Sequence, residues 1–266
     1  MVETVKIQKV IAQAGYASRR GAEDLILDGR VEVNDEIVLD VAMRIDPTKD
    51  VVRVDGEKVN FDRNMVTIAV NKPKGVVSAM EDPQGRPTLS DLVGNKYGRL
   101  FHIGRLDTAT EGLILMSNDG DLAQLIAHPS GEIQKVYVAT VNGKVKESEL
   151  KLLAKGFELN DGFTKFDKVR ILAHAQDQTV LECVLHSGKN RIVRRMLKYV
   201  NHPVQKLVRV QIGPIRLGEL KSGRERVLSD TEVSAIEALA KRGKKSSQFD
   251  ISVRKKDREK RLDRRK

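Results

Sequence analysis

The sequence predicts an α+β fold: a small N-terminal α+β module, followed by a larger domain whose mainly antiparallel, mixed sheet is flanked by helices. Short apolar runs typical of strands outnumber segments with helical periodicity, and strands and helices do not alternate as they do in a doubly wound fold. A chain of 266 residues, 40% of them hydrophobic, is long enough for one large and one small core.

Residues 1–62 are predicted to form the small module, which begins with two helices. Gly15 is placed to end the first helix, and Ser18 is placed to cap a second helix from Arg19 to Asp28. Two hairpins follow, with tight turns at Asn34-Asp35 and Asp55-Gly56.

The first turn of the second helix carries two cations, Arg19 and Arg20. Cations at a helix N-terminus oppose the helix dipole, and a bound phosphate relieves that cost. The pair therefore indicates contact with nucleic acid, although two solvated surface arginines are an alternative.

The larger domain is predicted to span residues 63–240, after a polar linker near Asp62. A loop rich in Pro and Gly at residues 73–87 is long enough to line a site. The other predicted elements are strands at 65–70, 100–103 and 113–116, a short helix at 121–127, a hairpin at 135–145 centred on Asn142-Gly143, strands at 180–186 and 204–215, and a last helix capped by Ser229 and Glu232.

A short polar loop between two buried strands presents Asp107. Gly104 and Gly112 bracket this loop and permit tight bends or the close approach of another molecule. The carboxylate is therefore a candidate nucleophile on a rigid support. From the residues alone, a structural aspartate that forms a turn or caps a helix is an open alternative.

A helix predicted over residues 191–200 has two distinct faces. One is an apolar stripe, and the other carries Arg191, Arg194, Arg195 and Lys198 at spacings of three and four residues. Cations without an interleaved acid repel one another unless an anion is near, so this face indicates phosphate binding, with a merely solvated face as the alternative.

Five strings of residues occur in order along the chain. They are Asn71-Lys72-Pro73-Lys74-Gly75, Gly104-Arg105-Leu106-Asp107 with Thr110 and Gly112-Leu113, Gly188 to Met196, Asn201-His202-Pro203-Val204, and Ile212-Gly213-Pro214. With these strings, residues 64–230 resemble the ribosomal RNA pseudouridine synthases of the small-subunit synthase A family, and most closely the large-subunit synthase B branch. The N-terminal module resembles the RNA-binding domain named after small-subunit ribosomal protein S-four.

The resemblance implies three catalytic residues. Asp107 supplies the catalytic carboxylate, and Tyr137, which ends a lysine-x-tyrosine string, lies against the target base and takes part in proton transfer. A basic residue at the position of Arg194 pairs with the aspartate and favours its charged form. Ile192 stands where many relatives have glutamine. From strand spacing alone, Tyr137 would be a packed tyrosine at a sheet edge.

The same resemblance implies contacts with RNA. Arg105 matches the arginine that enters the space left by the flipped base, where a planar cation stacks and contacts phosphate. Leu185 is expected to support the base from its strand. Lys189, Arg191 and Arg195 are expected to bind RNA.

The implied activity is the isomerisation of uridine to pseudouridine in ribosomal RNA, most closely large-subunit ribosomal RNA, without a cofactor. The residues do not decide whether Asp107 acts on the base or on the ribose. Small-subunit ribosomal RNA as the substrate, and a catalytically silent factor in ribosome assembly, remain alternatives. A methyltransferase is disfavoured because the sequence has no GxGxxG turn to bind a cofactor.

Composition excludes several other classes. The single Cys183 allows no disulfide framework, and the five histidines lack metal-ligand spacing, so no metal is predicted. Neither a signal peptide nor an apolar stretch long enough to span a membrane is evident. We expect a cytoplasmic monomer whose partner is ribosomal RNA or a ribosomal assembly intermediate, with no membrane partner.

Residues 241–266 are predicted to be a basic tail. They hold 13 Lys and Arg against 4 Asp and Glu, a net +9 of the chain's +11. So few apolar groups cannot offset the entropy of ordering, and the tail is expected to be disordered when free. Basic tails attract phosphates without regard to sequence, although a merely solvated end is the alternative.

Overall fold

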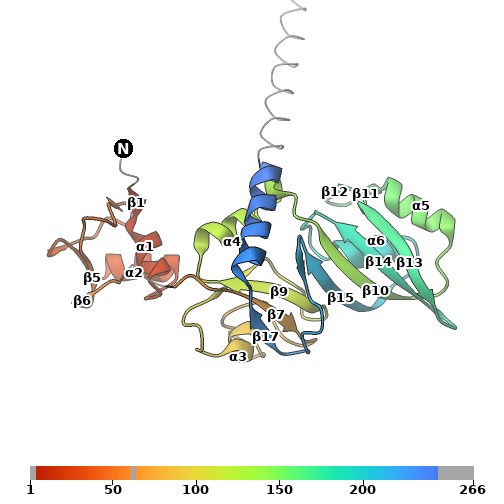
Figure 1. The fold of residues 1–266 in the computed structure, drawn as a ribbon, viewed down its shortest axis with the longest axis horizontal. Coiled ribbons are helices and arrows are strands. Elements are labelled where there is room, and N and C mark those ends of the chain that lie inside the picture. Colours follow the sequence, from red (N-terminus) through yellow and green to blue (C-terminus); the bar gives the residue numbers. More distant parts are fainter. Residues whose placement is uncertain (1–3, 61–63, 245–266) are drawn as a thin grey trace, which may run out of the picture. The chain divides into compact units, whose positions relative to one another are not determined.

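The computed structural model describes residues 4–60 and 64–244. The predicted boundary near Asp62 and most of the predicted tail, residues 245–266, lie outside the described residues. The chain divides into two compact units (Figure 1). The first holds the residues up to Val66 together with Asn95–Leu100 and Asn118–Gly120, and the second holds the rest from Thr67 onward.

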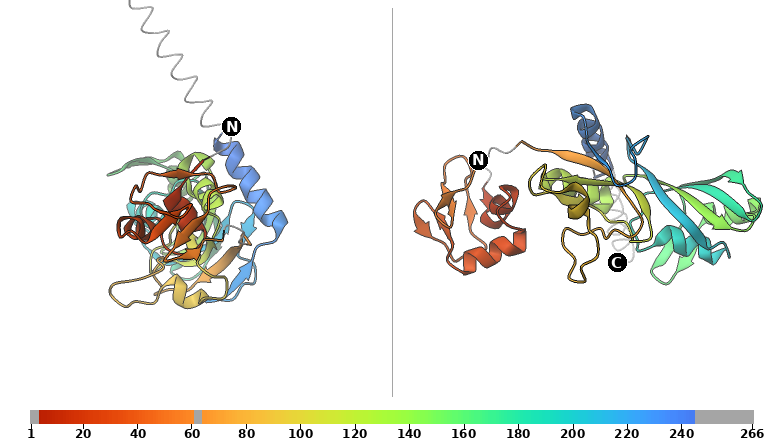
Figure 2. Two further views of the ribbon diagram at one scale, coloured as in Figure 1. Left: turned by 90° about the vertical axis from the view of Figure 1, so that its left-hand side faces the viewer. Right: turned by 90° about the horizontal axis from the view of Figure 1, so that it is seen from below.

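The N-terminal unit is an α+β module of two helices and small sheets (Figure 2). Its helices, α1 (Ile7–Gln13) and α2 (Arg19–Leu27), pack with the strands around one buried cluster of aliphatic side chains. Ser18 caps α2, as predicted, by accepting a hydrogen bond of 2.9 Å from Gly21 N. The strands are β1 (Val5–Lys6), paired with β4 (Arg44–Ile45), and a four-stranded sheet in the order β3 (Glu36–Ile37), β2 (Val31–Val33), β5 (Val52–Val54), β6 (Glu57–Lys58).

Both predicted hairpin turns in this unit are confirmed. Asn34 (φ 53°) and Asp35 (φ 67°) join β2 to β3, and Asp55 (φ 51°) and Gly56 (φ 79°) join β5 to β6. Positive φ at both central residues gives the turn a twist that matches the flanking strands, and Asn, Asp and Gly tolerate that conformation best.

The second unit is built on a nine-stranded sheet, and the predicted fold class is confirmed. The strand pairs are antiparallel except for one parallel pair, β15 with β9. In order across the sheet the strands are β13 (Lys168–His174), β14 (Gln178–Leu185), β10 (Lys135–Asn142), β15 (Val204–Ile212), β9 (Glu111–Ser117), β7 (Thr67–Lys72) and β17 (Glu225–Val227), with β16 (Ile215–Arg216) on β15 and β8 (Phe101–Ile103) on β9.

Helices cover the sheet in two groups. One core packs α5 (Glu147–Lys155) and α6 (Ile192–Tyr199) with β10, β14 and β15, and it includes Cys183, which is fully buried as predicted. The other core packs α4 (Gly120–Ala127) and the helix over residues 230–244 with β7 and β9. The remaining elements are α3 (Leu89–Val93), the 3₁₀ turn η1 (Pro129–Gly131) and a hairpin of β11 (Phe157–Leu159) with β12 (Gly162–Thr164).

The predicted capping box before the last helix is confirmed. Ser229 N donates to Glu232 Oε2 over 3.0 Å, and Glu232 N donates to Ser229 Oγ over 3.3 Å. The two reciprocal bonds satisfy backbone donors that a helix start leaves without partners.

The hairpin predicted over residues 135–145 is wrong. β10 is one continuous strand that pairs with β14 on one side and with β15 on the other. Gly143 does turn the chain, with φ 79°, but the turn leads into α5, which the sequence analysis did not predict. An Asn-Gly pair marks a change of direction, and which strand then pairs with β10 depends on segments far along the chain.

Gly112 lies where the two halves of the sheet meet through the parallel pair of β15 and β9. Its φ is 102°, and a Cβ added there would lie 2.3 Å from the carbonyl oxygen of Arg209. Only glycine permits that approach, so the close approach predicted for this loop is to the chain's own backbone.

Candidate active site

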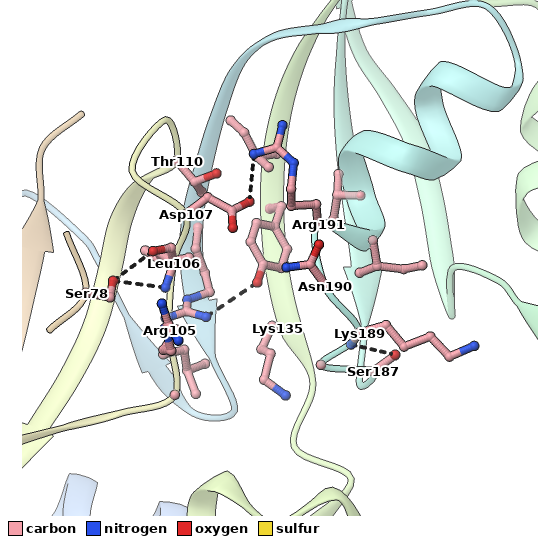
Figure 3. A pocket seen from close by; sticks show the side chains of 18 of the residues that line it. Ser78, Arg105, Leu106, Asp107, Thr110, Lys135, Ser187, Lys189, Asn190 and Arg191 are labelled. Atoms are coloured by element: carbon pink, nitrogen blue, oxygen red, sulfur yellow. Dashed lines mark hydrogen bonds and ion pairs between the residues drawn. The ribbon is translucent and has the colours of Figure 1, made fainter. Parts of the chain in front are cut away.

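A pocket of about 750 Å³ opens at the junction of β15 and β9 (Figure 3). Its walls come from the loop at residues 104–110, the start of β10, and residues 187–193 at the start of α6. These segments are far apart in sequence, and the sheet brings their side chains together. Asp107, Tyr137, Arg191 and Arg105 all line the pocket.

Asp107 sits in a loop that two backbone hydrogen-bond anchors hold in place. Ser78 Oγ donates to Leu106 O over 2.8 Å and accepts from Leu106 N over 3.1 Å. Gly75 N donates to Thr108 O over 2.9 Å. The residues on both sides of Asp107 are thus tied to the segment that follows β7, which gives the carboxylate a fixed base (Figure 3).

Arg191 makes the ion pair with Asp107, at 3.5 Å between Nη1 and Oδ2. Arg191 does not belong to the regular helix: it is the N-cap of α6, and its φ of 47° is left-handed. The helical spacing used in the sequence analysis therefore does not apply to Arg191, whose side chain points toward Asp107 in Figure 3.

Arg194 was expected to pair with Asp107, and the structure gives it other partners. Its Nη2 donates to Ala109 O over 2.8 Å and to Thr110 Oγ1 over 3.4 Å. Burial lowers the pKa of Arg194, the charge of Arg191 adds to this effect, and the charge of Asp107 opposes it. Arg194 therefore supports the far end of the Asp107 loop, while Arg191 neutralises the carboxylate.

Tyr137 lies on β10 directly opposite Arg209 on β15. Arg209 Nη1 donates to the Tyr137 hydroxyl over 3.4 Å, and Arg209 Nε donates to Leu113 O over 2.7 Å. Tyr137 is therefore a pocket wall in the middle of the sheet, not at an edge, and a buried cation holds its hydroxyl.

A buried amine lies beneath the pocket. Lys72, at the end of β7, is 0% exposed and donates to Pro73 O over 2.9 Å and Val76 O over 2.8 Å. Burial lowers the pKa of Lys72 to about 8, while the charges of Glu111 and Asp107 oppose the shift. The amine therefore fixes the turn after β7 and adds positive charge below Asp107.

Lys135 adds a second amine at the pocket wall. It donates to Ile133 O over 3.0 Å and to His186 O over 3.1 Å. Its pKa is lowered to about 8 by burial and by the charge of Arg209. The site thus contains more cationic than anionic groups, an arrangement that attracts an electron-rich ligand.

Three residues expected to contact RNA have other surroundings. Lys189 Nζ donates to the carbonyl oxygens of residues 161, 162 and 163, and its amine points away from Asp107 in Figure 3. Arg195 pairs with Asp161 at 2.7 Å, so the predicted cationic face does have an acid beside it. Leu185 is 1% exposed and belongs to the core around α6. These contacts explain the three residues structurally.

The sequence analysis missed two residues of the site, Ser78 and Arg209. Arg209 shares a buried phase with Leu207 on the central strand β15, and a basic residue at such a position is unusual enough to have marked it. Ser78 lies in the loop rich in Pro and Gly, and nothing local distinguishes it from a turn serine.

The structure offers no metal centre in the part of the chain that it describes: no group of three or more His, Cys, Asp or Glu side chains is placed to hold an ion. Among the same residues, no helix is long and apolar enough to cross a membrane.

Comparisons with known proteins match both units. The family described as RNA pseudouridylate synthase matches residues 66–199, and the S4 domain family matches residues 5–52. An uncharacterised RNA pseudouridine synthase of Mycobacterium leprae is 46% identical over 237 residues, covering 87% of this chain and 92% of that protein. The ribosomal large subunit pseudouridine synthase B of Bacillus subtilis is 39% identical over 241 residues, covering 90% and 98%.

A solved structure agrees with these matches. The crystal structure of a pseudouridylate synthase aligns with a TM-score of 0.61 and 27% identity over 87% of this chain and 99% of that one. The expected likeness to the large-subunit synthase B branch is supported by the Bacillus protein. These matches give no support to the small-subunit synthase A family named in the sequence analysis.

Proposed function

The chain belongs to the RNA pseudouridylate synthase family, and from this premise we propose that it converts a specific uridine of large-subunit ribosomal RNA into pseudouridine. The observation that carries the proposal is the pocket in which Asp107, paired with Arg191, shares the walls with Tyr137. The large subunit is proposed because the Bacillus relative bears that name. The reaction places the protein with its RNA in the cytoplasm.

The reaction needs acid–base and nucleophilic groups. The bond between C1′ and N1 of uridine breaks, and a bond between C1′ and C5 forms. C5 then loses a proton and N1 gains one, so the product is an isomer of the substrate. Because no electrons are gained or lost overall, side chains such as a carboxylate and a phenol are sufficient.

Asp107 is the residue that we assign to the central step. Its carboxylate is held by the loop anchors at Leu106 and Thr108, and Arg191 attracts its charged form. From this position it acts either as a nucleophile or as a base on the ribose. Tyr137 offers its ring to a flipped uracil, which recovers part of the lost stacking, about 1–3 kcal/mol per base.

RNA binding is assigned to groups outside the central step. Arg105 lines the pocket, is exposed, and is placed at its rim to occupy the position of the flipped base. In the N-terminal unit, Arg19 and Arg20 are exposed in the first turn of α2, in a segment that matches the S4 domain. We propose that this pair binds phosphates of the same RNA.

The test is pseudouridine mapping of unmodified large- and small-subunit ribosomal RNA transcripts after incubation with the protein. We expect new pseudouridine in the large-subunit RNA, and none with Asp107→Asn, which should still bind RNA. Asp177→Asn is the matched control, because Asp177 is an exposed loop aspartate outside the pocket lining. Turnover by Asp107→Asn would refute the assignment of Asp107, and product confined to the small-subunit RNA would refute the choice of subunit.

A further inference from the structure

Arg209 is a buried guanidinium that is only partly satisfied. Its side chain is 3% exposed, Nε binds Leu113 O and Nη1 binds the Tyr137 hydroxyl. Nη2 is buried and has no hydrogen-bond partner among the described residues. Buried donors in folded proteins nearly always have a partner, so an unpaired donor on a buried cation suggests a ligand.

The charge of Arg209 is also unbalanced. Among the described residues no carboxylate forms an ion pair with it. Its charge contributes to lowering the pKa of Lys135 and of Lys72, so the three cations repel one another across the inner wall of the pocket. A negative or strongly polar group bound there would relieve this repulsion.

We propose that Arg209 is a catalytic residue whose Nη2 donates a hydrogen bond to a carbonyl oxygen of the flipped uracil and stabilises the negative charge that this base carries during the reaction. The inference rests on the proposed function. It assigns Arg209 to the base and not to a phosphate, because its donor lies beside the Tyr137 ring, at 6.0 Å from guanidinium carbon to ring centroid, in the interior of the site.

The chemistry gives this contact its purpose. When the bond between C1′ and N1 breaks, its electron pair stays on uracil and spreads onto the O2 and O4 carbonyl oxygens. The base then turns, C5 supplies an electron pair to C1′, the proton on C5 leaves and N1 is protonated. A cationic donor already in place in a water-poor site stabilises the charged stage more than the neutral substrate, and so accelerates the step.

The test combines a variant with substrates whose carbonyl oxygens are weakened as acceptors. Arg209→Met keeps the length of the side chain but removes the charge and all its donors. Three ribosomal RNA fragments are compared, with uridine, 2-thiouridine or 4-thiouridine at the position that the wild-type protein modifies. Rates are single-turnover rates of product formation, and RNA affinity and the thermal midpoint are measured for each protein.

We expect Arg209→Met to slow the uridine substrate roughly tenfold to hundredfold, the usual effect of losing a charged hydrogen bond in a transition state. One thio substrate should slow the wild-type protein by about tenfold and should slow Arg209→Met little further, because the sulfur and the variant remove the same contact. Arg170→Met is the control, since Arg170 pairs with Glu182 on the edge of the sheet and should leave all rates unchanged.

Three results would overturn the inference. They are a folded Arg209→Met protein with the wild-type rate, equal thio effects in wild type and variant for both carbonyls, and a wild-type protein that is indifferent to both thio substrates. If Arg209→Met does not fold, Arg209→Lys, which keeps the charge on a shorter side chain with fewer donors, is put through the same comparison. A wild-type protein that forms no pseudouridine at all would instead refute the proposed function.

Discussion

Replacing Ser78 with alanine should loosen the loop that carries Asp107. Ser78 is 2% exposed, and its hydroxyl both donates to and accepts from the backbone of Leu106, which is itself 5% exposed. The variant leaves a buried N–H and a buried C=O without this partner. The loop either bears the desolvation cost or moves so that water reaches Leu106.

The expected magnitudes follow from these two outcomes. Each backbone group left unpaired in a buried place costs about 1–3 kcal/mol, so unfolding should become easier by an amount in that range once the loop relaxes. A relaxed loop also displaces the carboxylate, and a misplacement near 1 Å lowers a rate by roughly a hundredfold. RNA affinity should stay at the wild-type value, because Ser78 does not contact solvent.

The assay separates position from stability. The unfolding free energy is measured in denaturant, RNA affinity by titration, and the chemical step by single-turnover pseudouridine formation. Ser90→Ala is the matched control, since Ser90 donates to Met80 O in the same segment but makes no bond to the Asp107 loop. If both variants lose the same stability and the same rate, Ser78 has no positioning role and the reasoning fails.

Three further outcomes are expected. Arg19→Ala with Arg20→Ala should weaken RNA binding and leave the folding midpoint unchanged, and unaltered affinity would remove the case for RNA contact by α2. Deleting residues 245–266, which carry 10 Lys and Arg against 4 Asp and Glu, should flatten the slope of log affinity against log salt by about 0.7 to 0.9 for each phosphate released; the modified uridine should stay the same, and an unchanged slope would identify a solvated end. Finally, the pKa of Lys72 lies at about 8 in the folded protein and at its ordinary 10.5 when unfolded, so between these pH values the unfolded chain holds more protons. Stability relative to Lys72→Met should therefore rise with pH from about 8 to 10.5, and a flat difference would contradict the assignment of a charged buried lysine.

Local chemistry made much of the fold predictable. The Ser18 cap, the turn at Asn34-Asp35 and the capping box at Ser229 each depend on residues within a few positions, and all three were predicted correctly. The partners of β10 depend on strands tens of residues away, so the same kind of turn signal at Asn142 misled the prediction of a hairpin.

The site divides in the same way. The motif at Asp107 and the tyrosine at 137 both line the pocket, as the resemblance implied. The choice between Arg191 and Arg194 could not be made from helical spacing, because one left-handed residue at the N-cap redirects the Arg191 side chain. Arg209 escaped notice since its importance comes from pairing across strands, where it meets Tyr137.

The parallel pairing at Gly112 has a consequence for how the protein is made. Asp107 emerges early from the ribosome, whereas Arg191 and the β15 segment that pairs with Gly112 follow about a hundred residues later. β15 also separates β9 from β10, so the central sheet cannot close until residues 204–212 have been synthesised. Contacts of such long sequence separation form slowly. A nascent chain therefore has its N-terminal unit well before it has a catalytic centre, and RNA bound early would meet an enzyme that is still inactive.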